Sequence, residues 1–223
     1  MSPYSVFSQA GTGMRLSERA LTGVKTFLFV AGLLPLAYLS AGAFLFPDWL
    51  GANPAETITR SNGDWALRLL LLTLTVTPLR RLSGWVWLLR LRRQFGLFTF
   101  FYVLLHVSSY ISFDHVFEVG EIFKDIAKRP FITVGFAAFI ILIPLALTST
   151  NAMVRRLGAR RWQALHRLVY ATAPLAVLHY WWMVKRDLTE PIIYALLLGV
   201  LLGYRIYVTT RRPLLRAPGA ARS

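Results

Sequence analysis

The sequence of 223 residues contains no cysteine. Disulfide bonds, thiolate catalysis, and zinc or iron–sulfur centres held by cysteine are therefore excluded. The chain also has no G-x-G-x-x-G segment after a strand, no Walker A loop and no H-E-x-x-H pair. A self-contained Rossmann-type nicotinamide or flavin oxidoreductase is excluded as well. Any redox chemistry must belong to a bound cofactor, with electrons supplied by another protein or by a lipid-soluble quinol.

Charged residues are scarce. They make up 16% of the chain against 56% hydrophobic residues, whereas a soluble domain has about 25% charged residues. The mean hydropathy is +0.51. Lys and Arg number 25 and Asp and Glu only 10, but the basic residues occur in short clusters between apolar segments, which is typical of membrane topology. We therefore expect an integral membrane protein in contact with lipid, and no nucleic-acid partner.

Six apolar segments approach the length of about 20 residues that a membrane-spanning helix needs. They are residues 21–46, 65–79, 95–113, 131–148, 164–184 and 191–208. The second is the shortest and gives the weakest signal. The sequence predicts an all-α integral membrane bundle of six transmembrane helices over residues 21–208. A cytoplasmic segment over residues 1–20 precedes it, and a basic cytoplasmic tail over residues 209–223 follows it.

The charges on the connections predict the orientation. Arginines gather before the first span, in the second and fourth connections, and after the last span, whereas nine of the ten acids lie in the other three connections. Lys and Arg resist export across an energised membrane, so the arginine-rich side is cytoplasmic. We expect a multi-pass protein of the bacterial inner membrane with both termini inside. Residues 116–127 are expected to form a short amphipathic helix on the outer face.

Three of the four histidines fall within the predicted spans, where an ionisable side chain is costly and is a functional candidate. His115, beside Asp114, is interpreted as a solvated loop residue. His106 and His179 lie on the third and fifth spans, within about 3 Å of the same depth toward the outer face. Two neutral imidazoles at one depth on two helices suit the axial positions of a low-spin haem iron.

His166 would lie about 20 Å from His179 along the fifth span, near the inner face. No usual haem ligand is found at that depth on the third span, so three roles stay open for it: ligand to a second haem, hydrogen-bond partner of a quinone, or contact to a propionate. Arg68, Arg93 and Arg167 are candidates for propionate or quinone contacts. Snorkelling to the interface is an equal alternative for Arg68 and Arg167.

Two other classes of protein compete with a membrane cytochrome. A transporter or proton-pathway protein would use buried histidines as relays, but the sequence has no internal repeat and almost no acid within the spans. A structural anchor would use its histidines for packing alone. Only a cytochrome would be coloured when purified.

Three segments that contain the span histidines or lie between them in the sequence resemble those of a known family. They are FTFFYVLLHVSSY, RPFITVGFAAFIILIPLALTSTNAM and RRLGARRWQALHRLVYATAPLAVLHYWW, and they occur together with GANPAETITRSNGDWALRLLLLTLTVTPL. In order, spacing and flanking residues they are similar to the MsrQ (formerly YedZ) family of the ferric-reductase-like transmembrane superfamily. The resemblance runs from about Met14 to Val208 and implies a six-helix haem-binding bundle.

This resemblance implies a function as well as a fold. Members of the family pass electrons from the quinone pool, or from a cytosolic flavin reductase, to MsrP, a periplasmic molybdopterin enzyme that reduces methionine sulfoxide in oxidised proteins. Haem b is the implied cofactor, FMN has been associated with the family, and His106, His166 and His179 match its haem-associated histidines. Larger ferric reductases have two histidines on each of two helices. This chain has one on the third span, so one haem is expected and a second stays open. The expected role is non-catalytic electron transfer, the alternative being a cytochrome b subunit of another periplasmic oxidoreductase.

Overall fold

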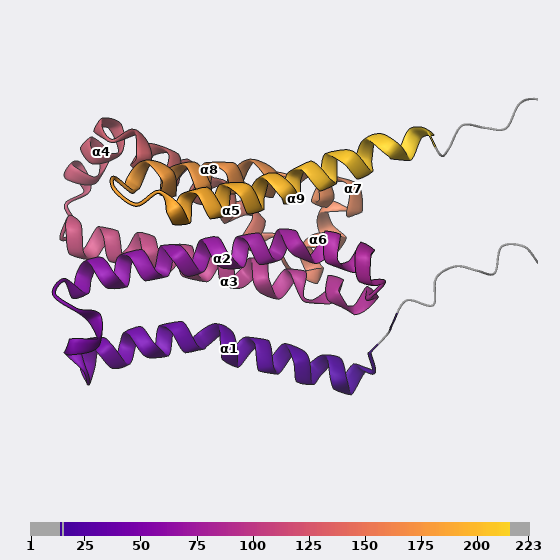
Figure 1. The fold of residues 1–223 in the computed structure, drawn as a ribbon, viewed down its shortest axis with the longest axis horizontal. Coiled ribbons are helices and arrows are strands. Elements are labelled where there is room, and N and C mark those ends of the chain that lie inside the picture. The colour runs from indigo at the N-terminus through magenta and orange to yellow at the C-terminus, as the bar shows by residue number, and fades with distance from the viewer. Residues whose placement is uncertain (1–13, 15, 215–223) are drawn as a thin grey trace, which may run out of the picture. The chain divides into compact units, whose positions relative to one another are not determined.

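The computed structural model describes residue 14 and residues 16–214, with side chains up to residue 210, and every regular element in this part of the chain is a helix (Figure 1). The chain divides after Glu118 into two compact units. The elements of the first unit are α1 (Glu18–Phe44), η1 (Pro47–Leu50), α2 (Pro54–Ser83), η2 (Val86–Arg90), α3 (Arg92–Ser109) and η3 (Tyr110–Asp114). The elements of the second are α4 (Val119–Lys128), α5 (Pro130–Leu147), α6 (Asn151–Leu157), α7 (Ala159–His166), α8 (Val169–Met183) and α9 (Thr189–Leu214).

Local sequence signals set the helix ends of the first unit. The Ser17 side chain accepts a hydrogen bond from the backbone N–H of Ala20 and caps α1. Asn53 caps α2 in the same way by accepting from the N–H of Glu56, and Pro54 follows it at the first helical position. α2 ends at Gly84, whose φ of 75° is the left-handed conformation that glycine adopts without strain. The connection after Gly84, which contains η2, brings α3 back along α2 (Figure 1).

The core of the first unit lies where α2 and α3 meet α1. Tyr102 on α3 is fully buried with Phe98 against Ala66 and Leu69 of α2, and Leu33 and Leu36 of α1 pack on the same cluster. The Tyr102 hydroxyl donates to the carbonyl oxygen of Gly32 at 2.6 Å. A methyl group at Gly32 would come within 2.9 Å of the Phe98 ring. The glycine therefore lets α1 approach α3 closely at this level.

The second unit is built on α5, α8 and α9. α5 begins at Pro130, packs along α8, and ends in a turn at Thr148. α8 in turn packs against α9. The two short helices α6 and α7 follow the carboxyl end of α5, and Gly158, with a φ of 74°, separates them. α4 contacts α5 at its other end, where the Thr133 hydroxyl donates to the carbonyl oxygen of Ile126.

The structure corrects the predicted fifth span. The sequence predicts one helix over residues 164–184, but α7 ends at His166 and α8 begins at Val169. Hydrogen bonds between residues three apart, from the N–H of Leu168 to Leu165 and from that of Tyr170 to Arg167, form a tight turn between them. Pro174, the proline within the predicted span, lies inside α8 and not at this turn. His166 and His179 therefore belong to different helices.

Four of the described helical segments are long and apolar enough to cross a membrane. They are Glu18–Phe44, Val86–Asp114, Pro130–Leu147 and Thr189–Thr210. α2 begins at Pro54, eleven residues before the predicted span, and its 30 residues include several charges. α8 has only 15 residues, about 22 Å of helix. The all-helical fold of the described residues is thus confirmed, and four helices suit a membrane. Six spans, the domain limits and the sides of the termini stay predictions.

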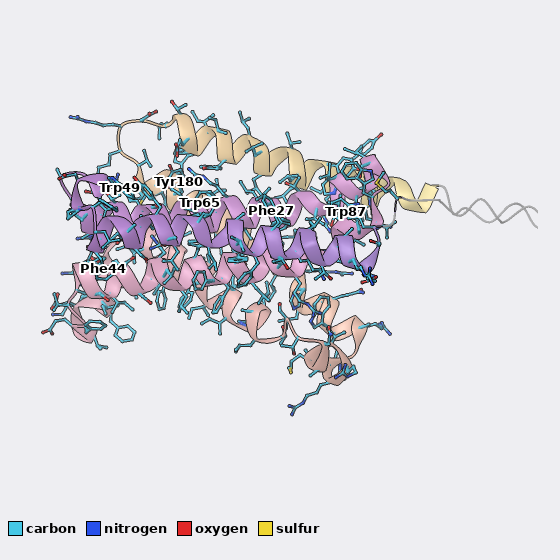
Figure 2. All side chains as sticks on the ribbon, turned by 90° about the horizontal axis from the view of Figure 1, so that it is seen from below. Phe27, Phe44, Trp49, Trp65, Trp87 and Tyr180 are labelled. Atoms are coloured by element: carbon cyan, nitrogen blue, oxygen red, sulfur yellow. The ribbon has the colours of Figure 1, made fainter. Side chains whose placement is uncertain are left out.

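Aromatic side chains mark both ends of the first unit. Trp49 stacks on Tyr38 with 5.4 Å between ring centroids, and Trp85 stacks on Trp87 at 5.7 Å. Figure 2 shows Trp49 and Trp87 toward opposite ends of the long axis. Between these ends α1 exposes large apolar side chains, among them Phe27 at 71% exposure. This distribution is typical of helices whose ends lie at the two membrane interfaces.

Candidate functional site

His106 lies in the last turn of α3 and faces α2. Its Nδ1 is 2.8 Å from the carbonyl oxygen of Thr59, in the second turn of α2. Gly63 lies one helical turn further along α2. A methyl group there would be 3.1 Å from both Nδ1 and Cε1 of the His106 ring. The absence of a side chain at Gly63 therefore makes room for the half-buried imidazole between the two helices.

His179 lies near the end of α8 and faces α5 in the same way. Its Nδ1 is 2.7 Å from the carbonyl oxygen of Phe131, at the start of α5. Gly135 lies one turn further along α5, and a methyl group there would be only 2.6 Å from Nδ1 and 2.8 Å from Cε1. The Phe131 ring is tilted toward the imidazole, with 6.2 Å between the centroids.

The two arrangements share one geometric cause. A helical Cα–Cβ bond points toward the amino end of its helix, so the side chain at position i+4 covers the carbonyl oxygen at position i. The accepting carbonyls at Thr59 and Phe131 each have a glycine at i+4, namely Gly63 and Gly135. The glycine uncovers the oxygen, and the imidazole of the neighbouring helix reaches it.

These hydrogen bonds also fix the tautomers. A carbonyl oxygen can only accept, so Nδ1 of His106 and of His179 must carry the hydrogen. In a neutral imidazole the lone pair then lies on Nε2, which is the atom that binds a metal. Histidine ligands in metalloproteins commonly donate the other ring N–H to a backbone carbonyl in this manner. Both side chains therefore fit the role of axial ligand to a haem iron.

His166 is bonded differently, at the other end of the second unit. Its Nε2 is 3.0 Å from the Thr148 hydroxyl, and that hydroxyl donates to the carbonyl oxygen of Pro144 at 2.6 Å. Because the hydroxyl has one hydrogen, it accepts from Nε2–H of His166. Trp162 stacks on the imidazole with 4.0 Å between centroids and donates through Nε1 to the carbonyl oxygen of Thr148 at 2.9 Å.

The second unit therefore separates its two membrane histidines along α5. The His179 partner Phe131 is the second residue of that helix, and the His166 partner Thr148 follows its last residue. The 17 residue steps between Phe131 and Thr148 correspond to about 25 Å of α-helix. His166 and His179 thus lie near opposite ends of this unit. The expectation that His106 and His179 share one depth involves both units and stays a prediction.

The three candidate arginines lie on separate elements. Arg68 is half-buried on α2, with its guanidinium carbon 5.1 Å from the centroid of the Trp65 ring. Arg93 is exposed in the first turn of α3; thirteen residues separate it from His106, about 20 Å of helix. Arg167 is exposed in the turn between α7 and α8. Contacts of these side chains to a propionate or a quinone stay predictions.

The structure corrects the interpretation of His115 and adds residues that the sequence did not single out. His115 is half-buried, not fully solvated, and its Nε2 lies 2.8 Å from the Tyr110 hydroxyl. Gly63 and Gly135 border His106 and His179, and Thr148 and Trp162 hold His166. A glycine within an apolar span is a visible signal of close helix approach, but its partner is on another helix and cannot be read from the sequence.

Comparisons with known proteins identify relatives over most of the chain. Residues 62–177 match the family model described as "Ferric reductase like transmembrane component". The chain is 58% identical over 193 residues to the "Protein-methionine-sulfoxide reductase heme-binding subunit MsrQ" of Herminiimonas arsenicoxydans, covering 86% of this chain and 88% of the relative. Proteins of the same name are 52% identical in Azospira oryzae, covering 93% and 87%, and 54% identical in Rhodospirillum rubrum, covering 90% and 95%.

Proposed function

Because this chain belongs to the MsrQ family and contains a ferric-reductase-like transmembrane component, we propose that it is the haem-binding electron-transfer subunit of a methionine sulfoxide reductase system. It accepts electrons from the quinone pool, or from a cytosolic flavin reductase. It delivers them to an MsrP-like periplasmic molybdopterin subunit, which reduces methionine sulfoxide in oxidised proteins. The names of the relatives support the haem and the methionine sulfoxide reductase.

The observation that carries this proposal is the shared bonding of His106 and His179. Each donates Nδ1–H to a helical carbonyl and thereby keeps the lone pair on Nε2. Among the described residues no three His, Asp or Glu side chains form a cluster that could hold a bare metal ion. Two separate imidazoles suit a haem, because its porphyrin supplies the four other nitrogen ligands and the protein supplies only the axial ones.

Haem b bound by these residues would supply a reversible one-electron Fe(III)/Fe(II) couple. His106 and His179 would hold it through Nε2, and ligation by two imidazoles would favour electron transfer over oxygen binding. Thr59 and Phe131 hold each imidazole in one tautomer and one orientation through their carbonyl oxygens. The protein's own task is to position the cofactor and to set its reduction potential.

The charge distribution of each unit supports an outward direction of electron transfer. In the first unit, His106 lies beside the amino end of α2, whereas Arg80 and Arg81 lie in the last turn of that helix. In the second unit, His179 lies beside the start of α5, and the arginines of α6 and α7 follow its end. With the arginine-rich ends on the cytoplasmic side, both histidines would lie toward the periplasm and both termini would be cytoplasmic.

The finer assignments rest on the positions of these residues in the sequence and on the family resemblance. His166 is a ligand of a second haem, a quinone partner or a propionate contact, and its present bond from Nε2 to Thr148 would have to break for ligation through that atom. Arg68, Arg93 and Arg167 are the candidates for propionate or quinone contacts. FMN, which only the family resemblance implies, stays a prediction. The number of haems stays a prediction as well.

The test is the optical spectrum of detergent-purified protein in the oxidised and dithionite-reduced states. We expect a sharp b-type α band in the wild type and its loss in His106→Ala and in His179→Ala. His115→Ala is the matched control, because its imidazole bonds to Tyr110 on the same chain segment, and it should retain the band. A wild type that stays colourless after haem is added would contradict the proposal and favour a transporter or an anchor.

A further inference from the structure

We propose that Gly63 and Gly135 are positioning residues for haem binding, because each glycine holds open the space in which the neighbouring histidine presents Nε2. The inference rests on the proposed function, since it takes His106 and His179 as the haem ligands. It goes beyond that function by assigning a role to two residues with no functional side chain. It also predicts that the two positions differ in how strictly they require glycine.

The space at Gly135 is the tighter of the two. A methyl group there would be 2.6 Å from Nδ1, 2.8 Å from Cε1 and 3.0 Å from Cγ of His179. Three ring atoms at or below 3.0 Å leave no room for a Cβ, so the imidazole or α5 must move. The ring cannot move alone without lengthening its 2.7 Å bond to Phe131. Alanine at Gly135 is therefore expected to displace Nε2 from its position.

The space at Gly63 tolerates more. A methyl group there would be 3.1 Å from Cε1 and Nδ1 of His106 and 3.7 Å from Cγ. A shift of a few tenths of an ångström relieves such contacts. His106 can keep its bond to the Thr59 carbonyl after that shift, because the present distance of 2.8 Å is within the normal range for a hydrogen bond. Alanine at Gly63 is therefore expected to perturb haem binding less than alanine at Gly135.

The effect of these glycines reaches the cofactor through the histidine ring. Groups that bond to a ligating histidine set its orientation and its basicity, and their loss commonly lowers metal affinity about 10- to 100-fold. Axial-ligand geometry and hydrogen bonding also set the reduction potential of a haem. If a glycine only allowed two helices to approach each other, its replacement would change neither the haem affinity nor the reduction potential of the folded protein.

Other helical glycines provide matched controls. At Gly23 on α1 and Gly199 on α9, a methyl group would meet no atom of another described element within 4 Å. Alanine at these sites removes a flexible residue from a helix and fills open space. Gly199→Ala is the better control for Gly135→Ala, because both residues belong to the second unit.

The experiment titrates haem-free protein with haemin and records the dissociation constant and the oxidised spectrum. For Gly135→Ala we expect the dissociation constant to rise about 10- to 100-fold and the low-spin spectrum to become partly high-spin. For Gly63→Ala we expect a rise of less than about 10-fold with the spectrum still low-spin. Gly199→Ala should match the wild type, and the midpoint potential should shift in the same order.

Two further measurements separate the outcomes. Added imidazole should restore the low-spin spectrum of Gly135→Ala, because the free ligand replaces the displaced ring. If Gly135→Ala does not fold, Gly63→Ala decides the matter: wild-type affinity and potential would then overturn the inference. A folded Gly135→Ala identical to Gly199→Ala would also overturn it. A wild type that binds no haem would instead refute the proposed function itself.

Discussion

The two ends of α5 each hold one histidine of the second unit, and the two are bonded in opposite ways. At the amino end, Nδ1 of His179 donates to the backbone carbonyl of Phe131. At the carboxyl end, Nε2 of His166 donates to the Thr148 hydroxyl. A backbone carbonyl cannot be a donor, so it fixes the tautomer of His179. A hydroxyl can reverse its role, so the bonding of His166 can adapt to a ligand.

The difference also concerns what covers each ring. Gly135 leaves His179 in contact with a bare helix backbone, whereas the indole of Trp162 stacks on His166. An aromatic ring that stacks at 4.0 Å excludes other planar groups from that side of the imidazole. This difference favours the proposed role of His179 in iron ligation. For His166 it favours a structural role, or a contact that leaves Nε2 on Thr148, over ligation of a second haem.

The largest difference is expected on removing each imidazole. His179→Ala should lose most of its haem, at least about tenfold relative to wild type, because an axial ligand is removed. His166→Ala should retain more than about half of it, since the His179 environment lies about 25 Å away along α5. The measurement is haem content per protein by the pyridine haemochrome assay. Equal losses in the two variants would erase the proposed distinction.

The next largest effect is expected at Trp162. Trp162→Ala removes the stacking on His166 and the hydrogen bond to the Thr148 carbonyl. The indole is only half-buried, so we expect a loss of about 2–3 kcal/mol, at the lower end of the range for large-to-small substitutions. Thermal unfolding in detergent measures it, with Trp162→Phe as the control that keeps a stacked ring. Unchanged stability in Trp162→Ala would show that the stack does not hold α7.

A smaller effect is expected from the Thr148 hydroxyl. Thr148→Val leaves the His166 Nε2–H without its acceptor, which costs about 1–2 kcal/mol for a partly buried group. Thr148→Ser should restore the bond and most of the stability. The α band should be the same in all three proteins if His166 is not an axial ligand of the His106/His179 haem. A changed α band in Thr148→Val would show that the His166 end of α5 affects the haem bound by His179 at the other end.

The sequence allowed the residue types of the site to be predicted, but not their partners. His106, His166 and His179 stand out because ionisable groups are rare in apolar segments, and the helices follow from those same segments. The hydrogen-bond partners of these histidines could not be predicted. Whether a carbonyl such as that of Phe131 is exposed to a neighbouring ring depends on a glycine one turn away and on which helix packs there. The periodicity of one helix does not show which other helix packs against it.

The break before α8 illustrates the same limit. Pro174 is the visible breaker in this segment, yet it lies in the second turn of α8, where the carbonyl that loses its bond is that of Tyr170, close to the start of the helix. The turn forms instead after His166, where bonds to Thr148 and the stack on Trp162 hold the end of α7. These contacts come from the packing of α7 on the end of α5, which the local sequence does not reveal.

The smallest expected effect lies on α4, which adjoins the His179 end of α5. The Lys124 Nζ donates to Glu121 at 2.7 Å on the exposed surface, and this hydrogen bond with the nearby negative charge raises the pKa of Lys124. A raised pKa means that the pair contributes to stability below the ordinary lysine pKa of about 10.4 and that the contribution is lost as pH rises through the folded-state value. Glu121→Gln should lower the pKa of Lys124 toward its ordinary value. NMR titration of methylated lysine in the two proteins measures this.

The haem spectrum should not respond between neutral pH and about pH 9 in either protein, because the lysine stays charged over that range and the pair lies on the exposed surface, whereas His179 bonds to the Phe131 carbonyl. A spectral change that follows the Lys124 titration would show instead that α4 controls the environment of that histidine. The difference between the two ends of α5 would then include the charged residues on the surface of α4.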